Sequence, residues 1–210
     1  MKLILLLSQG MVVTIQIFVL TLIFALPLGL VVSFARRSKN FILSGIAGIY
    51  ISIMRGTPLI LQLVAVYFGP YYIFDGKIDR FAAAIIAFSL NYAAYFAEIY
   101  RGGIESIPKG QYEAGEVLGY TRAQVFFKII LPQVIKRILP AISNEVITLV
   151  KDTALVTIIG VAEMFRAASN EASRLTQIQP LFVAGIFYYI MNLIVAQIFK
   201  FTENKLNYYR

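Results

Sequence analysis

Long apolar stretches separated by short polar segments run along the whole chain. Leu3–Ala35 and Leu175–Phe199 contain no charged residue, and each is longer than the roughly 20 residues that a helix needs to cross a bilayer. This pattern predicts an all-α membrane protein with a single domain over residues 1–210. We expect about five transmembrane helices, at about residues 11–35, 58–74, 81–101, 133–151 and 178–200.

Two parts of the pattern do not fit an uninterrupted span. The apolar stretch 41–74 is interrupted at Arg55 and again at Thr57-Pro58. Proline disfavours helical geometry in the residue before it, so we expect a shallow helix, then a break, then a spanning helix. The segment 155–168 is moderately apolar but too short and too interrupted for a span. A re-entrant or interfacial helix is expected there.

The composition agrees with a membrane protein and excludes several functions. Hydrophobic residues make up 59% of the chain and the mean hydropathy is +0.76, whereas soluble proteins hold about 45–50% apolar residues. The chain has no cysteine and no histidine, which excludes disulfides, histidine-containing catalytic triads and the usual zinc sites. It also lacks the G-x-x-x-x-G-K-[ST] loop that cradles ATP phosphates. If the protein pumps, the energy must therefore come from a partner.

The formal net charge of +8 is better explained by topology than by nucleic-acid binding. Most of the 19 Lys and Arg residues lie in three segments, namely 36–39, 101–137 and 200–210. Basic residues accumulate on the cytoplasmic side of membrane proteins. With these three segments inside, five spans place the N-terminus outside and the C-terminus inside.

The polar stretch Gln111–Pro132 has the pattern of two short helices joined at a glycine. Gly119 is placed as the left-handed residue that ends a first helix. Thr121 and Gln124 have the spacing of a capping box, which opens a second helix. Taken alone, the pattern fits either an amphipathic loop on the membrane surface or a docking element for another protein.

The spacing of particular residues favours the docking element. Five spaced positions match the EAA loop of the permease subunits of ABC importers, including its glycine and its I-x-L-P ending: Glu113-Ala114, Gly119, Ile129, Leu131 and Pro132. The one departure is Gly115, where that motif usually has alanine. The run RGTPLILQL at residues 55–63 is in addition similar to the corresponding segment of polar amino acid permeases.

This resemblance implies a fold and a set of partners. The chain would be one ABC type-1 transmembrane domain of the cytoplasmic (inner) membrane of a prokaryote, with a cytoplasmic coupling-helix loop at residues 105–132 between the third and fourth spans. Two copies of a soluble ATPase would bind ATP and Mg, so this chain would be a transport subunit without cofactor, metal or nucleic acid. A second permease copy, as a homodimer or a related heterodimer, and an extracytoplasmic solute-binding protein would complete the importer. The residues expected to dock the ATPase are those of the motif: Glu113, Ala114, Gly115, Gly119, Ile129, Leu131 and Pro132.

Carboxylates in or near the spans indicate a class of substrate. A cationic side chain that crosses a low-dielectric path needs compensating carboxylates, so we expect basic amino acids, namely arginine, lysine or histidine. Free backbone groups at a helix break can hold the two ends of an amino acid. The candidate substrate-binding residues are Glu163, Glu98, Thr57, Glu145 and Asp152.

Alternatives stay open for these residues. Glu98 can pair with Arg101, and Glu163 with a basic residue three positions further on in the same way. Asp152 adjoins a lysine, and Asn91 is expected to hydrogen-bond between helices rather than to bind cargo. If the acids are paired and face no pore, glutamine or another polar amino acid is an equally good cargo. A passive channel or a signalling membrane protein, whose loop binds some other effector, is the alternative from a different class.

Overall fold

The computed structural model describes residues 2–206, and all regular structure within that range is helical. Most elements are α-helices, with one π-helix (η1) and one 3₁₀ helix (η2). In chain order they are α1 (Lys2–Arg36), α2 (Phe41–Gly56), α3 (Leu59–Phe74), α4 (Arg80–Glu105), α5 (Lys109–Val117), α6 (Arg122–Val125), η1 (Phe126–Ile130), α7 (Leu131–Asp152), η2 (Thr153–Ile159), α8 (Met164–Leu175) and α9 (Gln179–Lys205). The prediction of an all-α fold is confirmed.

Within residues 2–206, three helices are long and apolar enough to cross a membrane, namely α1, α4 and α9. The α2–α3 pair gives a fourth candidate if it counts as one span, because its two helices meet at a 109° bend. α7 has the length of a span but is too polar to qualify by composition. The total of five spans therefore stays a prediction.

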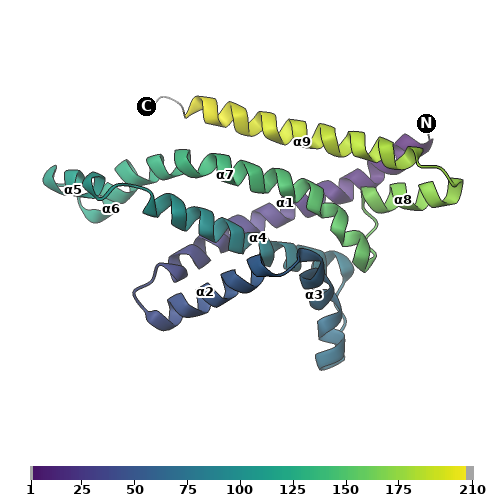
Figure 1. Ribbon diagram of the computed structural model, residues 1–210, viewed down its shortest axis with the longest axis horizontal. Helices are drawn as coiled ribbons and strands as arrows, with labels where there is room; N and C mark the ends of the chain where they lie inside the picture. Colours follow the sequence, from purple (N-terminus) through teal and green to yellow (C-terminus); the bar gives the residue numbers. More distant parts are fainter. Residues whose placement is uncertain (1, 207–210) are drawn as a thin grey trace.

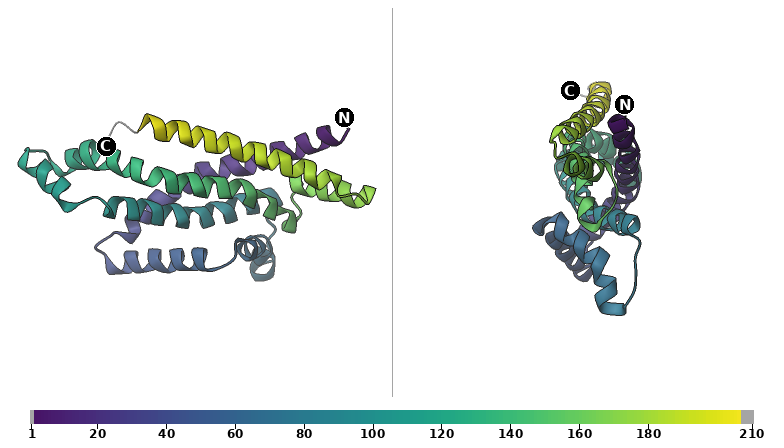
Figure 2. Two further views of the ribbon diagram at one scale, coloured as in Figure 1. Left: turned by 45° about the horizontal axis from the view of Figure 1, so that its top comes forward. Right: turned by 90° about the vertical axis from the view of Figure 1, so that its right-hand side faces the viewer.

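The break in the second apolar stretch falls at Thr57-Pro58, as predicted. The directions of the two helices relative to the bundle differ from our expectation. α2, expected to be shallow, runs alongside α1 and α4, whereas α3 turns across the bundle (Figures 1 and 2). Thr57 itself is extended, with φ −120° and ψ 147°. Since proline forbids helical geometry before it, the chain changes direction there.

The α4 helix forms the centre of the molecule. Small side chains cover much of its buried surface, including Ala83, Ala87, Ala93 and Ala97. Small residues let membrane helices approach closely without a hydrophobic driving force. The approach of α1 is closest at Gly29, where a Cβ would lie 2.8 Å from the Cβ of Phe96. A glycine is therefore needed at that crossing.

The two ends of the bundle hold different elements. One end carries α5, α6, the turn between α1 and α2, and the last turn of α9 (Figure 1). The N-terminus and α8 lie at the opposite end, in both side views (Figures 1 and 2). The three base-rich segments of the sequence thus share one end, although Arg210 lies outside the described residues. The 153–175 region forms η2, a left-handed turn at Gly160 and α8, and none of these is a spanning helix.

Candidate functional site

The loop between α4 and α7 folds into the two short helices that the sequence predicts. Gly119 adopts the left-handed conformation, with φ +77°, just after the end of α5. The capping box is complete: Gln124 N–H donates to Thr121 Oγ1 at 3.3 Å, and Thr121 N–H donates to Gln124 Oε1 at 2.9 Å. Both local predictions are confirmed. Residues 109–130 lie within the coupling-helix loop expected at residues 105–132, and we call them the coupling loop after that resemblance; a role in coupling stays a prediction.

The buried contact of α5 is made by Gly115, the residue that departs from the usual motif. A Cβ there would lie 2.7 Å from Val125 Cγ2 and 3.1 Å from Ile129 Cδ1. The glycine therefore lets α5 lie directly on α6 and η1. Ala114, the residue before it in the motif, is exposed.

No other segment of residues 2–206 covers the opposite surface of α5. Glu113 is exposed, and Val117 and Leu118 are 87% and 71% exposed at the tip of the loop. Burial of one such apolar side chain is worth about 1.5–3 kcal/mol. A carboxylate beside two uncovered apolar side chains, on a loop outside the bundle, is a surface suited to a protein partner.

The coupling loop is joined firmly to the bundle through the start of α7. Leu131 and Pro132 begin that helix, directly after the π-helix η1. Gln133 Nε2 donates to Ile129 O at 2.8 Å and to Gln111 Oε1 at 3.2 Å, which connects α7 to α5. These hydrogen bonds link α5 and η1 to the first turn of α7.

The break between α2 and α3 is held by two amide side chains. Asn91 Nδ2 on α4 donates to Met54 O and to Gln62 Oε1, both at 2.9 Å. Gln62 Nε2 in turn donates to Thr57 Oγ1 at 2.7 Å and to Thr57 O at 3.1 Å. These bonds satisfy backbone groups that the broken helix frees. The expectation that Asn91 bonds between helices is confirmed.

A polar cavity of about 250 Å³ lies beside this break, between α4 and α7. It is bordered by one residue of the break, three of α4 and three of α7, with Leu59 from α3: Thr57, Leu59, Asn91, Tyr92, Tyr95, Glu145, Thr148 and Asp152. Three of the five candidate substrate residues are thus brought together, namely Thr57, Glu145 and Asp152. Asp152 does not form the solvated pair with Lys151 that we considered, because its Oδ2 accepts a hydrogen bond from Tyr92 Oη at 2.7 Å.

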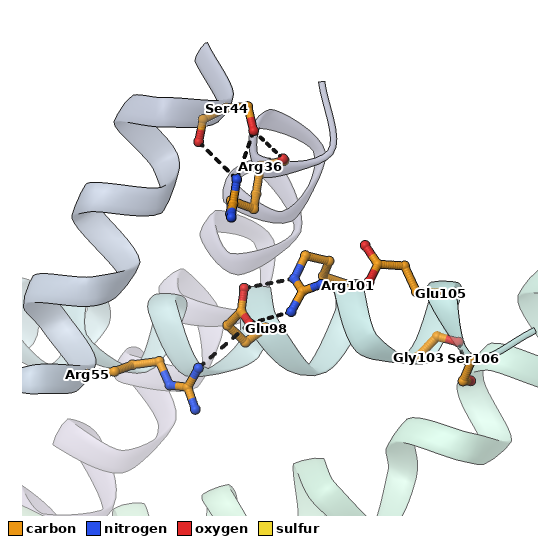
Figure 3. Close-up of polar contacts among 8 residues, drawn as sticks. All are labelled: Arg36, Ser44, Arg55, Glu98, Arg101, Gly103, Glu105 and Ser106. Carbon is orange, nitrogen blue, oxygen red and sulfur yellow. Dashed lines mark hydrogen bonds and ion pairs between the residues drawn. The ribbon is translucent and has the colours of Figure 1, made fainter. Parts of the chain in front are cut away.

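Glu98 lies outside the cavity and is paired. Its carboxylate accepts from Arg101 Nε at 3.0 Å and Nη2 at 2.7 Å, and Arg55 Nη1 lies 3.7 Å away (Figure 3). The i,i+3 pair with Arg101 is confirmed. Arg55 also stacks over the ring of Tyr95, 5.3 Å from its centroid. Glu98 therefore binds Arg101 on its own helix and links α4 to Arg55 of α2.

Glu163 is fully buried and begins α8 as its N-cap. Its two oxygens accept the backbone N–H groups of Phe165 and Arg166, each at 2.7 Å, and Tyr188 Oη donates to it at 2.8 Å. The side-chain pair with Arg166 that we considered is not formed, since that guanidinium donates to Thr157 O at 3.1 Å. Glu163 thus joins α8 to α9 and lies apart from the cavity.

From the sequence we named no aromatic residue of this cavity, and we expected Asn91 only to bond between helices. Asn91 and Tyr95 are four positions apart on α4, and Glu145, Thr148 and Asp152 follow at three and four on α7. Residues with these spacings share one face of a helix. A polar stripe on each of two helices was the signal that could have found them.

Long membrane-type helices, a polar cavity at a helix break and an exposed helical loop at one end define a membrane permease. A crystal structure described as an amino acid ABC transporter with histidines has the same fold, with a TM-score of 0.90 and 33% identity over 97% of this chain and 95% of that one. The arginine transport system permease protein ArtQ of Bacillus subtilis is 44% identical over 94% of this chain and 91% of its own length. The glutamine transport system permease protein GlnP of Escherichia coli is 37% identical, with 96% and 93% covered.

The family model that matches this chain is described as binding-protein-dependent transport system inner membrane component, and it covers residues 6–208. The chain belongs to that family. It is a permease subunit of the ABC importer type, and the resemblance seen in the EAA-like spacing is confirmed at the level of the family.

Proposed function

We propose that this chain is the translocation subunit of an ATP-driven importer for polar amino acids, and that its cargo is basic: arginine, lysine or histidine. Permeases named for arginine and for glutamine are 44% and 37% identical to it, so the amino acid class has support from both. Their names do not agree on charge. The choice of a basic cargo is carried by the polar cavity.

The charge of the cavity comes from two carboxylates. Glu145 and Asp152 both border it, and neither forms an ion pair within residues 2–206. The nearby Arg55 is directed to Glu98 and to the ring of Tyr95. Carboxylates that form no ion pair in a region of low dielectric attract a cation and repel an anion. The side chain of arginine or lysine would supply the missing positive charge.

The helix break offers complementary groups for the other end of the cargo. Thr57 borders the cavity, and the α3 N-terminus begins two residues later. Helix N-termini in broken membrane helices point their free N–H groups at anionic groups of a substrate. We place the α-carboxylate of the amino acid at this break and its side chain toward Glu145 and Asp152.

The energy source and the partners follow from the coupling loop. We propose that an ATPase subunit binds Glu113, Ala114 and the uncovered tip of α5, while Gly115, Gly119 and the Ile129–Pro132 ending hold the loop in shape. Two ATPases would act on two permease copies, which are identical or closely related. ATP and Mg would be bound there and not by this chain. The coupling-loop end would then lie in the cytoplasm, which agrees with its share of basic residues.

The proposed orientation predicts which residues can be labelled from outside. The chain has no cysteine, so a single introduced cysteine is unique. Gln177→Cys, in the exposed turn after α8, is expected to react with an impermeant maleimide in intact spheroplasts. Lys109→Cys, at the start of α5, is expected to react only after permeabilisation. The reverse labelling pattern would refute an outside N-terminus and an inside C-terminus.

Uptake into proteoliposomes that contain the importer tests the function directly. With radiolabelled arginine as cargo, we expect ATP-dependent accumulation that unlabelled lysine or histidine reduces and glutamate does not. The same accumulation should be absent without the ATPase. Glutamine that competes better than unlabelled arginine would overturn the basic assignment but keep the importer. Accumulation that needs no ATP would instead favour a passive channel.

A further inference from the structure

Two arginines meet at the left-handed turn between η2 and α8, far from the polar cavity and the coupling loop. Gly160 has φ +84°, and a Cβ there would lie 3.0 Å from Arg80 Nη1 and 3.3 Å from Arg166 Nη1. The two guanidinium groups therefore flank the same glycine from different elements, the start of α4 and the first turn of α8. We call Arg80 and Arg166 the arginine pair.

Neither guanidinium of the arginine pair is held by a carboxylate within residues 2–206. Arg80 Nε donates to Tyr67 Oη at 3.2 Å, and Arg166 Nη1 donates to Thr157 O at 3.1 Å, both neutral groups. Neither arginine forms an ion pair in the part of the chain that the structure describes. The adjacent Asp79 instead caps α4, with its Oδ2 accepting from Ala82 N–H at 3.0 Å.

Two other arginines of the chain are paired with carboxylates. Arg101 is held by Glu98 and Glu105, and Arg174 on α8 is held by Glu171 at 2.6 and 2.8 Å. Two like charges that share one turn repel each other, so their convergence costs free energy unless an anion joins them. Arginine presents N–H groups in a fork that matches a carboxylate.

A shallow pocket opens at the arginine pair. It has a volume of about 300 Å³ and is bordered by Tyr67, Phe68, Arg80, Ile158, Gly160 and Arg166, with Ile159. Arg80 is exposed and Arg166 is half-buried, so both groups can be reached from solvent. The pocket is large enough to receive the end of a side chain but not a folded segment.

The position of the pocket selects its partner. The turn that forms the pocket comes after α7 and η2 in the chain. The 22 residues of α7, at about 1.5 Å each, separate this turn from the coupling loop. α8 and the N-terminus lie at the same end of the bundle (Figure 1). The family depends on a binding protein, and that soluble partner must meet the face opposite the ATPase.

We propose that the arginine pair is a docking site for a carboxylate side chain of the external solute-binding protein. This inference rests on the proposed function, because it needs this end of the bundle to lie outside. The bound carboxylate joins the two guanidinium groups across Gly160, and thereby links α4 to the turn that leads into α8. Docking thus contacts the N-terminal end of α4, the helix that also carries Asn91, Tyr92 and Tyr95.

The test uses the complete complex of permease and ATPase in nanodiscs, with the importer's own binding protein loaded with its amino acid as the probe. We expect Arg80→Gln and Arg166→Gln each to weaken binding about tenfold, since loss of one partner of an interfacial charge pair acts on affinity. Stimulation of ATP hydrolysis by the binding protein should fall in parallel, while basal hydrolysis stays unchanged. Binding to the wild type should weaken as salt is raised, and binding to the variants should depend less on salt.

Arg174→Gln is the matched control. It removes the same charge from α8, but from a guanidinium that Glu171 already holds, so binding should change less than about twofold. Arg166→Lys should be intermediate, because it keeps the charge without the fork. The amount of inserted protein and its melting temperature in detergent show that each variant is folded.

Two results would overturn the inference, and they differ from a failure of the proposed function. If Arg80→Gln and Arg166→Gln bind the binding protein as the wild type does, the docking site is refuted while the importer stands. Loss of copurified phosphatidylglycerol from those variants would then assign the arginine pair to a lipid phosphate. If the wild-type complex itself is not stimulated by the binding protein, the proposed function fails, and the docking site with it.

Discussion

Replacement of Glu113 by lysine is expected to lower ATP-driven uptake about thirtyfold, with the protein still inserted in the membrane. Glu113 is exposed on α5, next to the uncovered Val117 and Leu118. Reversal of a charge at the centre of a protein interface costs about 2 kcal/mol, which is close to a thirtyfold loss of affinity. Because Glu113 is exposed and forms no ion pair within residues 2–206, its replacement should leave the fold unchanged.

Copurification of the ATPase with the permease measures this effect, alongside uptake in proteoliposomes. Glu203→Lys is the matched control, since it reverses a carboxylate at the same end of the bundle but on α9. It should leave ATPase binding and uptake at wild-type levels. Wild-type copurification and uptake in Glu113→Lys would remove α5 from the coupling role.

Gly119→Val tests the shape of the same loop by a different route. A Cβ at Gly119 would meet no atom within 4 Å, so the substitution causes no clash. Its φ of +77° is nevertheless in a region that a β-branched residue almost never adopts. The strain, about 1–2 kcal/mol, should turn α5 away from α6 and reduce ATPase binding. Gly110→Ala, a helical glycine also without neighbours, should have no effect.

The parts of the fold that depend on local chemistry could be predicted from the sequence. A proline bars helical geometry in Thr57, a glycine permits the left-handed residue 119, and the Thr121–Gln124 spacing closes a capping box. All three effects act within a few residues. For the same reason, the pair of Glu98 with Arg101 on one helix was predictable.

The parts that depend on packing between distant segments could not be predicted. The sequence does not show that a Cβ at position 115 would meet Val125, so the departure from the motif had no explanation. It equally gives no sign that Glu163 contacts Tyr188, 25 residues away, rather than a pore. Which half of the α2–α3 pair follows the bundle depends on contacts of α2 with α1 and α4. Each of these facts depends on how two separate helices pack, and not on a pattern within a few consecutive residues.

The candidate substrate-binding residues also divide into what the sequence indicates and what only the structure shows. From the sequence, four carboxylates were candidates by charge, with Glu163 and Glu98 the first to test, and Thr57 was a candidate because of the helix break. Geometry separates them, because Glu98 is held by two arginines and Glu163 caps α8, while Glu145 and Asp152 border the cavity without an ion pair in the described part of the chain. Carboxylates that form no ion pair are the ones that a cationic cargo can use.

Neutralisation of Glu145 or Asp152 is therefore expected to remove the preference for basic cargo. In Glu145→Gln and Asp152→Asn, we expect the ratio of arginine uptake to glutamine uptake to fall about tenfold or more. Two unit charges about 4 Å apart interact with about 1–4 kcal/mol between bulk water and a protein surface, and 1.4 kcal/mol is a factor of ten. Asn at 152 keeps an oxygen that can accept the Tyr92 hydrogen bond, so the cavity should keep its shape.

The ratio of the two uptake rates is the quantity to measure, because a general loss of folding or coupling lowers both rates together. Glu98→Gln is the matched control: it removes a carboxylate that Arg101 and Arg55 already neutralise. Its total uptake can fall if the α2–α4 contact loosens, but its ratio should stay at the wild-type value. A ratio that changes in Glu98→Gln and not in the cavity variants would place the side chain of the cargo at Glu98, further along α4. If the ratio is unchanged in all three variants, no carboxylate of the cavity distinguishes a charged cargo from an uncharged one. The basic assignment would then be wrong, and a neutral amino acid such as glutamine would be the better candidate.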